Sequence, residues 1–345
     1  MPTTTEAQTL TSRARLPLLD ISRLEGDAAG RAAFLEELRQ AARDVGFFYL
    51  TGHGVPAQLE AQVRDVSRRF FALPEAEKLK VQMIHSPHFR GYNRAGLELT
   101  RGKPDWREQF DIHAEREPLP QGPGTPRWTR LQGPNLWPDA ALPELRPVLL
   151  EWQARLTEVA IRLVRAFTEA LVGDPDALEP IYAGSPNQTM KIIRYPGRTS
   201  GEPDQGVGAH KDSSLLTFVL QDEIGGLQVE REGEWVDAVP LPGTFVVNIG
   251  ELLELASNGY LKATVHRVVS PPAGRDRFSI AFFLGARLDA TVPLLDLPPA
   301  LAAEAKGPAS DPENPLFRNV GANYLKGRLR SHPDVAQRYH ADLLG

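Results

Sequence analysis

The chain has 345 residues, of which 41% are hydrophobic and 24% charged, as is ordinary for a globular protein. Its net charge of −5 argues against nucleic acid or an anionic membrane as the main partner. It has no cysteine, which excludes disulfides, thiolate zinc sites, iron–sulfur clusters and cysteine nucleophiles. The polar N-terminal residues lack the apolar core of a signal peptide, and no apolar run approaches a membrane span. We therefore expect a cytoplasmic protein that needs no membrane and no obligatory protein partner.

The first half of the chain predicts helices with a few short strands. In chain order we expect a disordered arm at 1–15, a strand at 17–21, a helix at 28–44, a buried aromatic strand at 46–50 and a helix at 57–71. Residues 85–135 are rich in Gly, Pro, Arg and His, which predicts loops and short strands. A long helix follows at about 142–172.

The pattern changes after residue 190, where short β-rich runs alternate with Gly/Pro turns. These runs are MKIIRY, SLLTFVLQ, GLQVER, TFVVNI, ATVHRVV and RFSIAFFL. Strands at this spacing predict a sandwich or jelly roll, flanked here by helices. A Pro-rich stretch at 292–315 and a last helical segment near 322–329 end the chain. We expect one structural unit: a mostly helical region at 16–180, a β core at 181–290 and a helical extension at 291–345.

His210 and Asp212 are separated by one residue in a stretch that we expect to be a strand. Alternate residues of a strand share a face, so both side chains would point into the barrel and Lys211 away from it. His266 lies in a second β-like run. If the two strands meet, two histidines and a carboxylate form a facial triad, which is typical of non-haem iron(II) oxygenases. Taken singly, each histidine is also compatible with an ordinary buried, hydrogen-bonded role.

Two other pairs have a similar spacing but a different context. His332-Pro333-Asp334 contains a proline that breaks a ladder, and it looks like the start of a helix. His113-Ala114-Glu115 lies next to acidic residues in an expected loop or edge. We expect neither pair to bind a metal.

Arg277 and Ser279 form a further pair on one strand face. A guanidinium binds a carboxylate in bidentate fashion, and a neighbouring hydroxyl adds a donor. An arginine buried in a barrel needs an anionic partner; alternatively, Arg277 lies at the surface after the turn at Gly274. The order His-x-Asp, His, Arg-x-Ser is what an enzyme would need to hold Fe(II) and a dicarboxylate together.

The motifs described above, together with their flanking sequences, resemble those of a known enzyme family. Residues 190–286 resemble the catalytic core of the isopenicillin N synthase-like family of iron(II)/2-oxoglutarate-dependent oxygenases. The matching stretches are IRYP, GVGAHKDSSLLTFVLQDEIGGLQVE, PLPGTFVVNIGELLELASNGYLKATVHRV and RFSIAFFLGA. PLLDISRL, GFFYLTGHGV, FFALPEAEK and GYNRAG are similar to the opening region of that family, so the resemblance covers about residues 16–335.

The resemblance implies a double-stranded β-helix that oxidises a small organic substrate with Fe(II), 2-oxoglutarate and O₂ and releases succinate and CO₂. With Asp212 present, no ligand position is open for a halide, so hydroxylation or desaturation is expected. The residues that match functional positions are His210, Asp212 and His266 for iron, Arg277, Ser279 and Tyr195 for 2-oxoglutarate, and Phe283 for substrate.

One departure keeps an alternative open. Ile193 stands where many plant members of the family carry Asn. The sequence IRYP is more similar to that of isopenicillin N synthase itself than to those plant members. That enzyme oxidises its peptide without 2-oxoglutarate, so a cosubstrate-free oxidase is the alternative function. Its C-terminal glutamine has only a poor counterpart here in Gln337.

Functions from other classes fit less well. A ligand-binding sensor has no need for an open coordination face, and a redox-neutral cupin-like enzyme would not explain Arg277 and Ser279. A dinucleotide site is set aside because Gly206-x-Gly208 lacks a third glycine and a strand-to-helix context. The segment 88–111 is expected to cover the mouth of the barrel, where it would suit an anionic or polyhydroxylated substrate, or to be a solvated loop.

Overall fold

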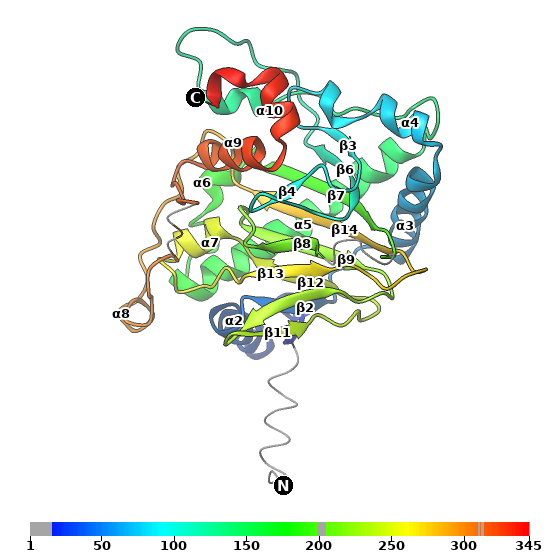
Figure 1. The fold of residues 1–345 in the computed structure, drawn as a ribbon. Coiled ribbons are helices and arrows are strands. Elements are labelled where there is room, and N and C mark those ends of the chain that lie inside the picture. The colour runs from blue at the N-terminus through cyan, green and yellow to red at the C-terminus, as the bar shows by residue number, and fades with distance from the viewer. Residues whose placement is uncertain (1–15, 199–204, 310, 312–313, 345) are drawn as a thin grey trace.

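Two facing sheets form the centre of the computed structural model, which describes residues 16–198, 205–309, 311 and 314–344 (Figure 1). The arm expected at 1–15 lies outside the described residues. The large sheet has eight strands, antiparallel except for the β1–β2 pair. In spatial order they are β1 (Leu18–Asp20), β2 (Phe47–Thr51), β12 (Phe245–Ile249), β9 (Leu216–Gln221), β14 (Arg277–Gly285), β7 (Asn187–Tyr195), β6 (Glu108–His113) and β3 (Gly91–Asn93).

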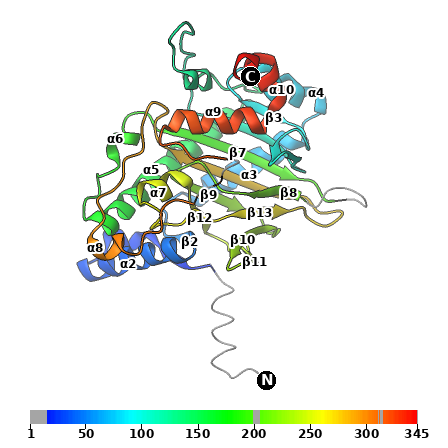
Figure 2. The ribbon, with the colours of Figure 1, turned by 60° about the vertical axis from the view of Figure 1, so that its left-hand side comes forward.

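The small sheet covers one face of the large one (Figure 2). Its four antiparallel strands are β11 (Glu234–Asp237), β10 (Leu227–Arg231), β13 (His266–Val269) and β8 (Gln205–His210). A separate hairpin of β4 (Leu99–Thr100) and β5 (Lys103–Pro104) lies against β8. This arrangement, with helices outside, is the expected jelly roll.

Helices surround the two sheets, and α2, α3 and α5 cover the other face of the large sheet. The bounds are α2 (Ala28–Asp44), α3 (Ala57–Ala72), α4 (Glu75–Lys80), α5 (Leu145–Val172), α6 (Glu179–Tyr182), α7 (Glu251–Ala256), α8 (Pro299–Ala302), α9 (Val320–Ser331) and α10 (Pro333–Tyr339). The long α5 packs on α2, α3 and the centre of the large sheet. It ends at Gly173, whose φ of 74° favours glycine. No helix in the described parts of the chain has the length and apolar character needed to cross a membrane.

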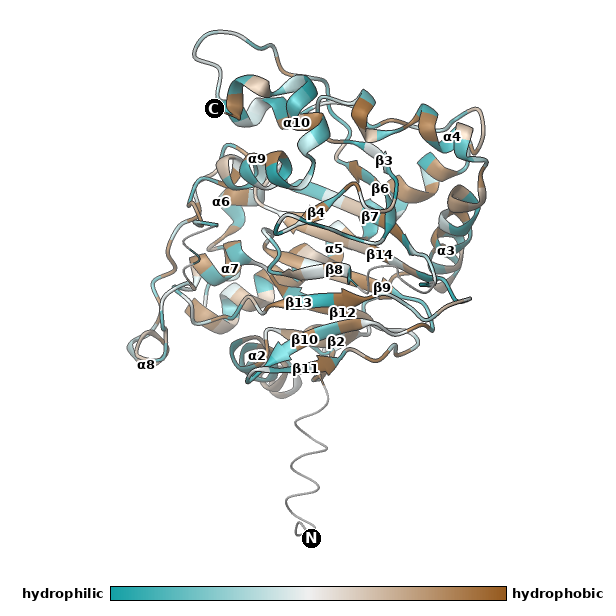
Figure 3. Ribbon diagram, in the orientation of Figure 1, coloured by the Kyte–Doolittle hydropathy of each residue, from teal (hydrophilic) through white to brown (hydrophobic). Residues whose placement is uncertain are grey.

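The alternation of side chains along the strands produces two cores. On β14, Ile280 and Phe282 face α5 and belong to the helix-side core, whereas Ala281 belongs to the core between the sheets. Hydrophobic residues accordingly fill much of the large sheet, while strand β10 of the small sheet is largely hydrophilic (Figure 3). The space between the sheets therefore receives every second residue of β7, β9 and β14.

The strand runs expected after residue 190 correspond to β7, β9, β10, β12, β13 and β14. The helices expected at 28–44, 57–71, 142–172 and 322–329 correspond to α2, α3, α5 and α9. Strands β1, β2, β3 and β6, from the first 113 residues, extend the large sheet on both sides. The expected division at residues 180 and 290 stays a prediction.

Candidate metal and cosubstrate site

His210, Asp212 and His266 converge between the sheets. Strands β8 and β13 pair His210 directly with His266. Nε2 of His210 lies 3.4 Å from Oδ1 of Asp212, and Nε2 of His266 lies 3.6 Å from Oδ2. In the described parts of the chain this is the one group of three such side chains that could hold a metal, with its donor atoms within 4.8 Å of one another.

The expected strand geometry of this motif is wrong, although the convergence is right. Strand β8 ends at His210, and Asp212 lies in the loop that follows. The carboxylate is placed by that loop rather than by the pleat of a strand. Lys211 borders the pocket, but its ammonium meets Glu254 of helix α7, which does not line the pocket.

Backbone carbonyls orient both imidazoles. Nδ1 of His210 lies 2.8 Å from the carbonyl oxygen of Gly208, and Nδ1 of His266 lies 3.1 Å from that of Thr264. A proton on each Nδ1 leaves each Nε2 as a free lone pair toward Asp212. This is the arrangement that a metal requires of imidazole ligands.

Two buried side chains from the large sheet hold the Asp212 carboxylate. Thr217 donates its hydroxyl to Oδ2 at 2.7 Å, and Asn248 donates its amide to the same oxygen at 2.9 Å. Oδ1 therefore keeps its lone pairs for a metal. Hydrogen-bonded carboxylates of this kind are typical of the groups that surround metal ligands.

For Asp212 and His266 the electrostatics favour the charge states that bind metal, whereas the Asp212 carboxylate raises the pKa of His210 against the effect of burial. Burial alone would raise the pKa of the Asp212 carboxyl, but His266, His210 and Thr217 hold it well below its usual range. Burial lowers the pKa of His266 to about 4, so this imidazole is neutral at pH 7. An ionised carboxylate and a neutral imidazole are the ligand forms for a divalent ion.

Arg277 is buried between the sheets rather than at the surface, with 1% of its area exposed. Nε donates to the carbonyl of Ile224 at 3.2 Å and Nη2 to the side chain of Gln221 at 3.0 Å. Its buried Nη1 has no hydrogen-bond partner in the described parts of the chain. A buried guanidinium with an unpaired N–H fits a ligand carboxylate.

The other candidates lie along the same inner face. Ser279 follows Arg277 by two residues on β14, and Tyr195 pairs with Arg277 across β7. The Arg277 guanidinium lies 4.9 Å from the centre of the Tyr195 ring. Ile193 belongs to the apolar core between the sheets, so it offers no polar contact at this position.

A pocket of about 1030 Å³ opens beside the triad. Phe283 lines it and pairs with Thr217 across the β14–β9 ladder, so this ring lies next to the residue that holds Asp212. The polar wall opposite comes from the β4–β5 hairpin, β7 and α9. Its side chains include Glu98, Thr100, Arg107, Thr189, Lys191, Tyr324 and Arg328.

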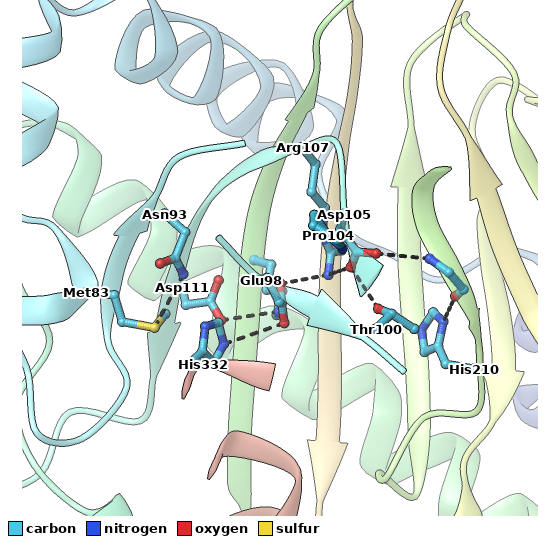
Figure 4. Close-up of polar contacts among 12 residues, drawn as sticks. Met83, Asn93, Glu98, Thr100, Pro104, Asp105, Arg107, Asp111, His210 and His332 are labelled. Atoms are coloured by element: carbon cyan, nitrogen blue, oxygen red, sulfur yellow. Dashed lines mark hydrogen bonds and ion pairs between the residues drawn. The ribbon is translucent and has the colours of Figure 1, made fainter. Parts of the chain in front are cut away.

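The hairpin is fixed to the strand that carries His210 by a carboxylate. Asp105 accepts hydrogen bonds from the Thr100 hydroxyl and the Gly208 amide, at 2.8 and 3.1 Å (Figure 4). Arg107 donates through Nη2 to Glu98 at 2.7 Å and to Asp105 at 3.3 Å. In the described residues these are all of its hydrogen bonds, and its buried Nε has none.

The two other His-containing motifs lie outside the triad. His113 is buried and hydrogen-bonded to Thr189 and Arg328, whereas the Glu115 carboxylate accepts from Asn135. His332 is also buried and precedes helix α10, with Asp334 in the first turn. The side chains of both motifs make contacts within the protein, and the expectation that neither pair binds a metal stays a prediction.

Sequence reasoning did not identify several of these polar residues. Thr217 and Gln221 occupy inward positions of β9, whose outward positions carry leucine and phenylalanine. Asn248 likewise interrupts the apolar run of β12. A polar residue at an inward position of an apolar strand was therefore the sequence signal that could have identified Thr217, Gln221 and Asn248. Arg107 and Glu98 gave no such signal, because the hydrophobic residues of their segment follow no regular period.

Comparisons with known proteins agree on one family. Residues 16–140 match the model described as non-haem dioxygenase in morphine synthesis N-terminal, and residues 186–286 match that of the 2OG-Fe(II) oxygenase superfamily. The chain is 37% identical to 2-oxoglutarate-dependent dioxygenase frbJ of Dothideomycetidae sp. (strain 11243), over 94% of this chain and 91% of that protein. It is 40% identical to homoarginine-6-hydroxylase 2-ODD-C23.1 of Arabidopsis thaliana, over 82% and 88%.

A solved structure gives the same result. The fold superposes on a 2OG-Fe(II) oxygenase family protein of Caulobacter crescentus with a TM-score of 0.72 and 28% identity, covering 91% of this chain and 98% of that one. This similarity confirms the jelly roll.

Proposed function

Since the chain belongs to the 2OG-Fe(II) oxygenase superfamily, we propose that His210, Asp212 and His266 hold its iron. The protein is a 2-oxoglutarate-dependent dioxygenase that uses Fe(II) and O₂ to oxidise a small molecule, and a cosubstrate-free oxidase is not favoured. When bound, iron and 2-oxoglutarate supply an oxidative decarboxylation, to succinate and CO₂, that is coupled to substrate hydroxylation. The protein residues position these groups and exclude water.

The observation that carries the cosubstrate assignment is the buried Arg277 with its unpaired Nη1. We assign the distal carboxylate of 2-oxoglutarate to Arg277 and Ser279, with Tyr195 against the same site. The guanidinium keeps two hydrogen bonds to protein oxygens, which fix its plane and aim the remaining edge. Asp212→Ala should abolish succinate formation, and near-wild-type succinate formation in that variant would overturn the triad.

The substrate proposed for the pocket is a small amino acid. Arg107 lines the same pocket as His210, and the Glu98 and Asp105 carboxylates keep its pKa above the usual range against the effect of burial, so it is fully charged. A substrate carboxylate at Arg107 would be held beside the triad, and Glu251, which lines the same pocket from α7, suits a cationic group. Relatives that are 37–40% identical are named homoarginine-6-hydroxylases, which supports this class. Phe283 would pack against the aliphatic part of the substrate.

Substrate-dependent succinate formation tests this class. L-Homoarginine, L-arginine and L-lysine should be compared with their decarboxylated amines, which keep the cationic group and lack the carboxylate. We expect turnover of at least one amino acid and a much higher KM in Arg107→Gln, with the KM for 2-oxoglutarate unchanged. Equal turnover of an amine and its parent amino acid would contradict the assignment of Arg107.

We also propose that the enzyme works in the cytoplasm without an obligatory protein partner. The cysteine-free sequence is compatible with a reducing compartment. Cell fractionation and the activity of the purified chain alone test these two points.

A further inference from the structure

Lys211 separates two of the proposed iron ligands and makes a partly buried ion pair with helix α7. Its Nζ lies 3.1 Å from both carboxylate oxygens of Glu254. The side chains are 19% and 6% exposed, respectively. The pair therefore links the segment between His210 and Asp212 to α7.

The same carboxylate also contacts the segment that carries the third ligand. Oε1 of Glu254 accepts a hydrogen bond from the amide of Ala263 at 3.1 Å, three residues before His266. One side chain thus touches both ligand-bearing segments, the loop after β8 and the approach to β13.

Helix α7 is itself fixed to the ligand loop by its backbone. The amides of Gly250, Glu251 and Leu252 donate to the carbonyls of Leu215, Asp212 and Ser214, at 3.0, 2.8 and 3.1 Å. A Cβ at Gly250 would lie 2.0 Å from the Ser214 carbonyl oxygen, so the two backbones are in close contact here. Glu254 therefore lies on a helix that backbone hydrogen bonds join to the ligand loop.

Stability alone gives little reason for this pair. Removing two charges from water costs about as much as their attraction returns, and an apolar pair of similar volume is often as stable. What a charged pair adds is a narrow range of allowed positions. We propose that Lys211 and Glu254 form a positioning pair that sets the spacing of the metal ligands, a proposal that rests on the iron triad assigned above.

Lys211 also lines the substrate pocket, which offers a competing role as a substrate contact. Its ammonium already meets both oxygens of Glu254, which favours positioning. The two roles predict different measurements, because a positioning residue affects iron affinity in the absence of substrate.

The experiment compares Fe(II) binding to the full-length apoprotein, under anaerobic conditions, in Lys211→Met, Glu254→Gln, the double variant and Lys211→Arg. Lys78→Met is the control, because Lys78 and Glu108 form a pair at 3.0 Å in another part of the fold, with side chains that are 9% and 7% exposed. The Fe(II) Kd and the visible band formed with 2-oxoglutarate are measured beside thermal unfolding of each apoprotein.

We expect each single neutralisation to weaken Fe(II) binding by about 10-fold, as is usual for groups that support metal ligands. The Fe(II) affinity of the double variant should be no lower than that of the single variant that binds iron more weakly. Lys211→Arg should bind Fe(II) nearly as tightly as wild type does. Lys78→Met should unfold at a lower temperature, with its Fe(II) Kd unchanged. Kd values within about twofold of wild type in both single variants, or an effect of Glu254→Gln without one of Lys211→Met, would overturn the pair. A wild-type protein that binds no iron would instead overturn the triad itself.

Discussion

Replacing Arg277 by Gln should remove the discrimination between 2-oxoglutarate and a cosubstrate that lacks the distal carboxylate. Arg277 is buried, and two of its donors are committed to Ile224 and Gln221. Nη1 therefore provides one charge-assisted hydrogen bond, worth about 1.5–3 kcal/mol. That range corresponds to a rise of roughly 10- to 150-fold in the KM for 2-oxoglutarate.

The assay measures kcat/KM for 2-oxoglutarate and for 2-oxopentanoate, which has the same carbon chain with a methyl group in place of the distal carboxylate. Wild type should prefer 2-oxoglutarate strongly, and Arg277→Gln should show little preference. Fe(II) affinity, measured alone, should be unchanged because Arg277 contacts no member of the triad in the described structure. A variant that keeps the wild-type preference would refute the assignment of Arg277.

Three further predictions concern the surroundings of the site. Thr217→Val keeps the shape of the side chain and removes the 2.7 Å hydrogen bond to Asp212. Fe(II) affinity, measured by anaerobic titration, should therefore fall about 10-fold. An unchanged Fe(II) Kd would contradict the role of Thr217. Gly250→Ala places a Cβ 2.0 Å from the Ser214 carbonyl and should lower both thermal stability and iron affinity, whereas Gly124→Ala, where a Cβ meets nothing within 4 Å, should leave iron affinity unchanged. Burial lowers the pKa of His332 to about 4, so below pH 6.5 the unfolded chain takes up a proton that the folded chain refuses. As the pH decreases from 6.5 to 4, this residue should therefore lower the free energy of unfolding by up to about 3 kcal/mol. Urea titrations of the apoprotein at pH 7 and pH 5 should show a smaller decrease for His332→Asn than for wild type.

The strands of the core could be predicted because their runs are short, apolar and separated by turn residues. Strand β8 was harder, since its sequence QGVGAH has little of the bulk that marks a strand. Its glycines have a structural reason: a Cβ at Gly208 would lie 2.8 Å from Thr100 of the hairpin. The glycine can be read from the sequence, but its contact with Thr100 cannot, because the two residues are distant in sequence.

The ligand residues could be found because spacing and chemistry agree, but the geometry that joins them could not. Asp212 reaches the site from a loop held by the backbone amide of Glu251, a long-range contact without a sequence period. Helix α7, which provides that amide, has only six residues and was not predicted. The polar wall with Arg107 also depends on pairing between segments that are distant in sequence.

Anaerobic titration of the apoprotein with Fe(II) and then 2-oxoglutarate tests most directly whether this site holds both groups. We expect a visible charge-transfer band that saturates at about one equivalent of each, disappears in His266→Ala and weakens in Arg277→Gln. Iron binding without the band would contradict the cosubstrate site, and the absence of iron binding would contradict the triad of His210, Asp212 and His266.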